Sequence, residues 1–111
     1  ATLSGVKDLM SAQYASVVEM YISNTALSVE KLRGYFEHGG NRQDLAREAH
    51  SMKSASRYLG AEQVSLCAKA LEEDFGGGAS DVALKARFDD LEQAWLSTRS
   101  FFETDLSKTV A

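Results

Sequence analysis

The sequence predicts an all-α protein, an antiparallel up-down-up-down four-helix bundle, and three observations predict it. The chain contains no proline, so nothing interrupts long helices. Apolar residues recur every three or four positions over long segments, which is the pattern of amphipathic helices. Glycines at positions 39–40, 60 and 76–78 divide the chain into these segments. Such short connections join antiparallel neighbours.

Length and composition bound the class of protein. The chain has 111 residues, and we expect residues 1–111 to form a single domain. The formal net charge of −4 gives no electrostatic reason to expect nucleic acid or a membrane surface as a partner. No apolar run approaches the ~20 residues of a membrane span. The single cysteine, Cys67, cannot form an internal disulfide. The lack of an internal disulfide favours a reducing compartment, so we expect a cytoplasmic protein. We also expect a monomer.

The N-terminal part of the chain predicts two helices. Val6, Leu9 and Met10 suggest a short extra helix that lies across one end of the bundle. A long helix follows over about residues 16–37. Its inward stripe consists of Val18, Ile22, Thr25, Val29, Leu32 and Phe36.

The second helix is predicted from its end signals. Asn41 is a good N-cap with Asp44 three residues later, and Gly60 suits the left-handed position that ends a helix near Leu59. The inward positions of this helix are Leu45, Ala49, Met52, Ala55 and Leu59, with Ser56 beside them.

The third and fourth helices complete the bundle. The third covers about residues 61–75, and the fourth starts at Ser80 or Asp81, either of which can cap it, and exceeds 20 residues. The inward positions of the third are Val64, Cys67, Ala68, Leu71 and Phe75. Those of the fourth are Leu84, Phe88, Leu91, Trp95, Thr98 and Phe102.

His50 is the candidate reactive residue. The inward positions of its helix centre roughly 200° around the helical wheel from it, so His50 faces solvent. Arg47, Lys53 and Arg57 share its face, although the chain as a whole is acidic. A solvated surface histidine is the ordinary alternative. A metal site is not predicted, because His38 is the only other histidine and His50 has no ligand type at i+3 or i+4.

An exposed neutral imidazole is a nucleophile near pH 7 and can form a covalent intermediate. If the group that His50 accepts is a phosphoryl group, Lys53 at i+3 can offset the arriving charge. Arg47 and Arg57 can assist, or can be ordinary solvated charges.

The segment REAHSMKSASRYLGAEQVSLCAKALEE, residues 47–73, resembles histidine phosphotransfer (HPt) domains of two-component phosphorelays. The similarity extends more loosely into the preceding helix through Tyr21 and Leu32, and the predicted four-helix bundle is also the fold of that family. The matching residues are Ala49, His50, Met52, Lys53, Ala55, Ser56, Leu59, Gly60, Ala61, Leu71 and Glu72.

The resemblance implies roles for particular residues. His50 would be phosphorylated at Nε2, and Lys53 would stabilise the phosphoryl group. Glu72 would hydrogen-bond the other ring nitrogen and orient the ring, unless it is a solvated acid at a helix end. The expected partner-docking residues are Ala46, Arg47, Ser51, Ser54 and Arg57, with Leu9, Met20 and Leu27 as further contributors unless they belong to the core.

Ser54 departs from the family pattern. Many family members carry glycine directly after the lysine, and this chain has serine there. Because serine is small, we expect docking to be tolerated with a changed affinity or choice of partner.

The resemblance also implies a function: a phosphocarrier that takes a phosphoryl group from a receiver-domain aspartate onto His50 and passes it to another receiver. No ATP site, enzyme activity or bound cofactor is expected, and Mg²⁺ would belong to the receiver. The expected partners are response-regulator receiver domains and a hybrid sensor kinase. The Ala1 start favours a domain of such a kinase over a free-standing carrier. The alternatives are a helical module that binds a receiver or kinase without carrying phosphate, and an unrelated structural bundle.

Overall fold

A computed structural model describes the backbone of residues 2–110 and the side chains of residues 12–108. Over the described backbone the chain forms four helices and no strand, as the sequence predicts. The helices are α1 (Thr2–His38), α2 (Arg42–Tyr58), α3 (Glu62–Gly76) and α4 (Asp81–Val110).

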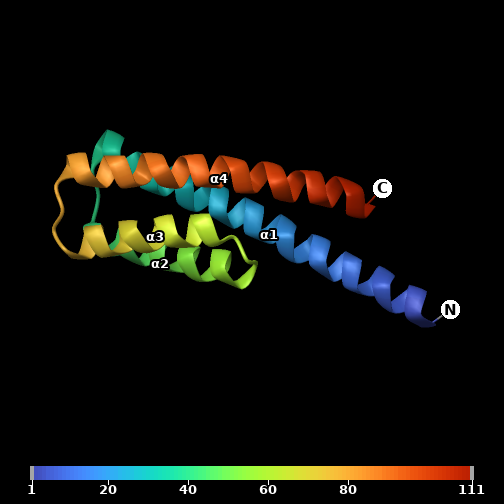
Figure 1. Cartoon of the computed structure of the whole chain (residues 1–111). Coiled ribbons are helices and arrows are strands. Elements are labelled where there is room, and N and C mark those ends of the chain that lie inside the picture. Colours follow the sequence, from blue (N-terminus) through green and yellow to red (C-terminus); the bar gives the residue numbers. More distant parts are fainter. Residues whose placement is uncertain (1, 111) are drawn as a thin grey trace.

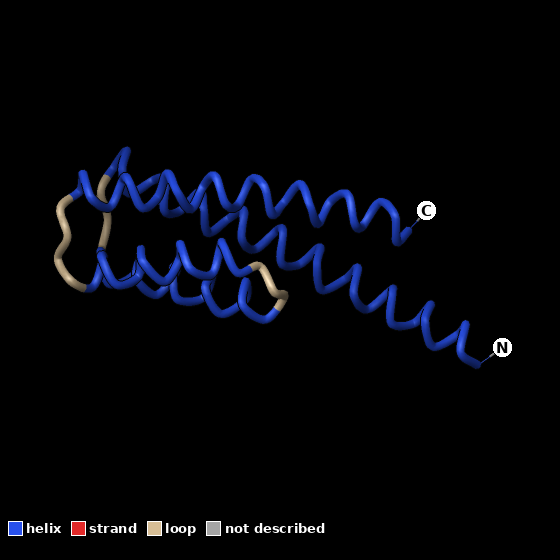
Figure 2. Tube along the Cα trace, viewed as in Figure 1, coloured by secondary structure: helices blue, strands red, loops and turns tan. Residues whose placement is uncertain are grey.

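Successive helices run in opposite directions, so both ends of the chain lie at the same end of an antiparallel bundle (Figure 1). α1 packs on α2 and α4, and α3 packs on α2 and α4. α2 and α3 are shorter, with 17 and 15 residues against 37 and 30 for α1 and α4. The two long helices consequently extend past the turn between α2 and α3 (Figure 2).

The helix ends follow the sequence signals. Asn41 caps α2, because its side-chain oxygen accepts a hydrogen bond of 3.1 Å from the backbone N–H of Asp44. Ser80 caps α4 through a bond of 3.2 Å from the N–H of Ala83. Gly60 has a φ of +76°, the left-handed conformation that glycine adopts without strain after a helix.

The predicted inward stripes form the core. Phe88 and Trp95 of α4 are nearly fully buried, and the Tyr21 ring meets the Trp95 ring edge-on with centroids 5.8 Å apart. Ala55 is exposed, which corrects its assignment to the inward stripe: it lines a surface pocket between α1 and α2 and is not packed in the core. The side chains with the least exposure are Val18, Leu32, Ser56, Val64, Leu71, Leu84, Phe88 and Leu91.

The prediction of a separate N-terminal helix is wrong. α1 runs without a break from Thr2 to His38, and Val6, Leu9 and Met10 lie in its first turns, with side chains outside the described residues. Between Gly5 and Gly34 the sequence has neither glycine nor proline, so nothing there ends a helix.

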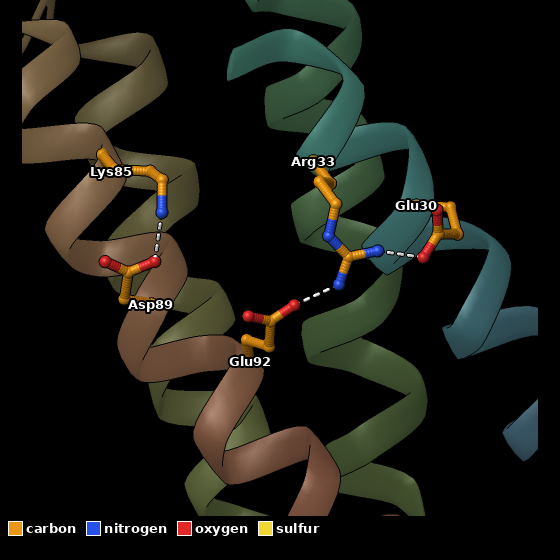
Figure 3. A network of polar contacts seen from close by, with 5 residues as sticks. All are labelled: Glu30, Arg33, Lys85, Asp89 and Glu92. Atoms are coloured by element: carbon orange, nitrogen blue, oxygen red, sulfur yellow. Dashed lines mark hydrogen bonds and ion pairs between the residues drawn. The ribbon is translucent and has the colours of Figure 1, made fainter. Parts of the chain in front are cut away.

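Polar contacts pin α1 to both of its neighbours. The guanidinium of Arg33 donates to Glu30 on α1 and to Glu92 on α4, and Figure 3 shows it between the two carboxylates. The hydroxyl groups of Tyr21 and Ser56 share a buried hydrogen bond of 2.6 Å between α1 and α2. These contacts fix the position of α2, which carries the candidate site.

Candidate functional site

His50 lies in the middle of α2 and points into solvent. Its neighbours Ala49 and Met52 are buried in the core, with relative exposures of 0% and 2%. With those two side chains directed inward, helical geometry turns His50 outward, and 57% of its side chain is exposed. The imidazole is therefore open to an approaching partner.

A carboxylate from α3 holds the inner edge of this imidazole. Nδ1 of His50 lies 2.8 Å from Oε2 of Glu72. An ionised carboxylate only accepts hydrogen bonds, so Nδ1 is the protonated nitrogen and donates to it. In the neutral ring Nε2 then keeps its lone pair. The nitrogen on the outer edge is thus the nucleophilic one.

Lys53 completes a three-residue cluster. Its ammonium donates a hydrogen bond of 2.9 Å to Oε1 of Glu72, so the two oxygens of one carboxylate serve two different cationic or proton-donating groups. Lys53 and Glu72 are each 26% exposed. The contact between Glu72 and the His50 ring that the resemblance implies is present, and the link between Glu72 and Lys53 was not foreseen.

Core packing and one further hydrogen bond fix the position of α3 along α2. Leu71, adjacent to Glu72, is fully buried, as is Ala68 one turn earlier. The hydroxyl of Ser65 donates to the backbone carbonyl of Lys53 over 3.1 Å. The packing of α2 on α3 therefore sets the distance between Glu72 and the imidazole.

The hydrogen bond from Lys53, followed by that from His50, lowers the pKa of Glu72 below its ordinary value of 4.5. The unfolded chain lacks these partners, so its Glu72 titrates near the ordinary value. The ionised carboxylate therefore stabilises the folded state above about pH 4.5, and this contribution is lost as the pH falls through the lowered pKa.

Glu72→Gln should reduce the free energy of unfolding at pH 7 by about 0.2–1 kcal/mol, the usual range for a partly exposed ion pair. At pH 3 the wild type and the variant should differ less, because the pH is then below the ordinary pKa of 4.5, Glu72 of the unfolded chain is protonated, and part of the stabilisation is lost. Urea unfolding at the two pH values measures both differences. Glu103→Gln, which removes the exposed partner of Arg99, serves as the control. An E72Q deficit that is equal at both pH values would contradict the assignment.

The predicted docking residues do not share one environment. Ser51, Ser54 and Arg57 are exposed around His50. Arg47 is also exposed and pairs with Asp44, one turn earlier, at 3.0 Å. Ala46 is half-buried and packs against the core. Their role in docking remains a prediction.

Two of the further contributors flank the α2 side of α1. Met20 and Leu27 are each 62% exposed, so they do not belong to the core. They directly precede Tyr21 and Ser28, which reach α2, the latter through a hydrogen bond of 2.6 Å to Glu48. Met20 and Leu27 therefore lie on the exposed shoulder of α1 nearest α2. The side chain of Leu9 lies outside the described residues.

Sequence reasoning missed the α3 residues beside the site. Ser65, Leu66 and Lys69 line a shallow groove together with Lys53 and Arg57. Their spacing of three and four residues, continued by Glu72, marked one face of α3. The sequence alone did not show that this face meets the His50 face of α2.

Two other kinds of feature are absent from the described residues. Residues 12–108 contain no group of three histidine, cysteine or acidic side chains placed to hold a metal ion. In the described part of the chain, no helix combines the length and apolar character needed to cross a membrane.

Comparison with known proteins identifies the family. The family model described as Hpt domain matches residues 16–100, which is more than half of the chain and includes the whole cluster. No curated protein and no solved structure gives a match. Hpt domains are helical phosphotransfer modules of two-component phosphorelays; they interact with receiver domains and have no ATP site of their own. The four-helix bundle with its outward histidine and the match over residues 16–100 together place the chain in the Hpt domain family.

Proposed function

We propose that His50 carries the phosphoryl group, accepting it from the phosphoaspartate of one receiver domain and passing it to the aspartate of another. The observation that carries this proposal is the bond of 2.8 Å between Nδ1 of His50 and Glu72, because it leaves Nε2 as an exposed nucleophile on a fixed ring.

The transfer is a displacement at phosphorus. The Nε2 lone pair of His50 forms the new P–N bond, while the P–O bond to the receiver's aspartate breaks and releases its carboxylate. The ring gains positive charge as the bond forms, and the adjacent Glu72 carboxylate stabilises that charge through Nδ1–H. Attack by the second receiver's aspartate on the phosphorus reverses these steps.

Lys53 would neutralise part of the phosphoryl charge. An ammonium has three donors, so Lys53 can keep its bond to Glu72 and direct another N–H at a phosphoryl oxygen. The chain's own contribution would then be positioning and charge stabilisation. The Mg²⁺ that such a transfer uses would be bound by the receiver, with no cofactor on this chain.

The test is to incubate the purified protein with phosphorylated receiver domains and Mg²⁺ and to follow label on the protein. A P–N bond is labile in acid and stable in base, whereas an acyl phosphate is labile in base. The proposal predicts acid-labile, base-stable label, and absence of label with every receiver of a broad panel would contradict it. A module that only binds receivers would form the complex without taking label.

Lys53→Ala should slow phosphoryl transfer by about 10–100-fold, which is less than the roughly 100–1000-fold loss for a preorganised oxyanion-hole donor because Lys53 is partly exposed. The fold should survive, since the side chain is partly exposed and the apolar packing around it remains. Rapid-quench measurements of transfer from one receiver give the rate. Lys85→Ala on α4, which removes an exposed lysine paired with Asp89, should transfer at the wild-type rate. A K53A rate equal to that of K85A would remove the role of Lys53.

A further inference from the structure

A basic groove extends from the cluster of His50, Lys53 and Glu72 along the surface between α2 and α3. Its volume is about 360 Å³, and Lys53 belongs both to the groove and to the cluster with Glu72. The groove is lined by Lys53, Arg57, Glu62, Ser65, Leu66 and Lys69.

The charges in this groove differ from those elsewhere on the molecule. Its lining has three cations and one carboxylate, although the chain has a net charge of −4. Among the described side chains, Arg33, Arg42 and Arg87 illustrate the usual state of a cation here, since each pairs with an acid. Arg57 and Lys69 have no acidic partner within 4.0 Å among residues 12–108. The groove therefore presents positive charge that the fold itself does not neutralise.

An apolar side chain lies beside these cations. Leu66 is 59% exposed, between Ser65 and Cys67 on α3 and one turn before Lys69. The aliphatic stems of lysine and arginine add apolar surface below their charged ends. The groove thus suits a polypeptide segment that carries acidic residues next to an apolar one.

A receiver domain has the complementary chemistry. Its phosphorylation site must present the reacting aspartate and bind Mg²⁺, which requires further carboxylates around it. With that site over His50, its acidic rim would lie at the edge of the cluster. Lys53 is located at this edge and also lines the groove. Opposite charges at such an edge speed association and select one orientation of the partner.

We propose that the groove of Arg57, Leu66 and Lys69 binds an acidic segment at the rim of the docking receiver, and that Arg57 and Lys69 determine which receivers dock and in which orientation. This inference rests on the proposed function and extends the docking surface from α2 onto α3.

The decisive variant is Arg57→Glu/Lys69→Glu. Its matched control is Lys85→Glu/Arg99→Glu, which changes the net charge equally but on α4, a helix that packs on α1 and α3 and not on α2. Circular dichroism and thermal unfolding establish that both variants fold. The probe is the receiver domain that transfers fastest to the wild type, phosphorylated and supplied with Mg²⁺.

The groove variant should accept phosphate from this receiver about 10-fold or more slowly than the control at ~0.05 M salt, and the gap should narrow at ~0.5 M salt, where surface charges are screened. Arg57→Lys/Lys69→Arg keeps both charges and should stay within about 3-fold of the wild type, because steering depends on charge. Equal rates for the groove variant and the α4 control would overturn the inference.

A small phosphoryl donor distinguishes phosphorylation of His50 from docking of the receiver in the groove. Phosphoramidate transfers its phosphoryl group to Nε2 with loss of ammonia and needs no docking surface. The groove variant should lose much less rate with phosphoramidate than with the receiver, because the proposed role of Arg57 and Lys69 is to contact the receiver. A variant that is equally slow with phosphoramidate would place the defect in the cluster and overturn the docking role. If neither phosphoramidate nor any receiver labels the wild type, the proposed function itself fails.

Discussion

His50→Gln should abolish phosphoryl acceptance from every donor and leave the fold intact. The nitrogen lone pair of the glutamine amide is delocalised into the carbonyl, so no P–N bond can form at this position. The side chain is 57% exposed, and the buried neighbours Ala49 and Met52 are untouched. The free energy of unfolding should therefore change by no more than about 0.5 kcal/mol. Label from a phosphorylated receiver and urea unfolding measure the two effects.

His38→Gln is the matched control. His38 is the other histidine of the chain, its side chain is 80% exposed on the last turn of α1, and it lies outside the cluster with Glu72. The H38Q variant should take label at the wild-type rate and to the same extent. Label retained by H50Q, or lost by H38Q with its fold intact, would show that the phosphoryl group is carried elsewhere.

Leu91→Ala should lower the free energy of unfolding by about 3 kcal/mol, within the usual range of 2–5 kcal/mol for emptying a fully buried leucine site. Leu91 has no exposed surface and belongs to the hydrophobic core, on the helix α4 that packs on α1 and α3. For a domain of this size the melting temperature should fall by roughly 15 °C. Thermal and urea unfolding provide the measurement. At low temperature the folded variant should still accept phosphate, because the substitution lies away from the cluster.

Leu96→Ala on the same helix controls for the loss of a leucine as such. Leu96 is 54% exposed, so its removal should cost no more than about 0.5 kcal/mol. Comparable destabilisation by L91A and L96A would contradict the packing of α4. So would an L91A variant as stable as the wild type.

Much of the fold could be predicted because its signals are local. Apolar spacing of three and four residues identified Leu32, Leu71 and Phe88 as core positions, and each is nearly fully buried. Asn41 begins α2 through its side-chain cap, and Gly60 follows the end of α2 through its left-handed backbone conformation. Such signals need no knowledge of the rest of the chain.

The start of α1 could not be placed in this way. Val6, Leu9 and Met10 form too short an apolar group to show whether they belong to a separate helix or to the long one. The deciding fact is the absence of a helix-breaking residue between Gly5 and Gly34. The apolar spacing of a short segment does not show whether a helix-breaking residue is missing from the longer stretch around it.

The candidate site likewise has features that one helix predicts and features that depend on packing between helices. The outward direction of His50 follows from its own helix, through Ala49 and Met52. The bridge from Glu72 to Lys53, and the meeting of Lys69 with Arg57 in one groove, depend on how far α3 is shifted along α2. That shift is set by core packing and by the bond from Ser65 to the Lys53 carbonyl. A single sequence does not specify these contacts.

The most direct test of the account is to locate the phosphorus on the phosphorylated protein by NMR with ¹⁵N-labelled histidine. We expect one phosphorus–nitrogen coupling, at Nε2 of residue 50, with the proton on Nδ1 and in contact with Glu72. Coupling at Nδ1 of His50, coupling at His38, or phosphorus on an oxygen atom would contradict the account.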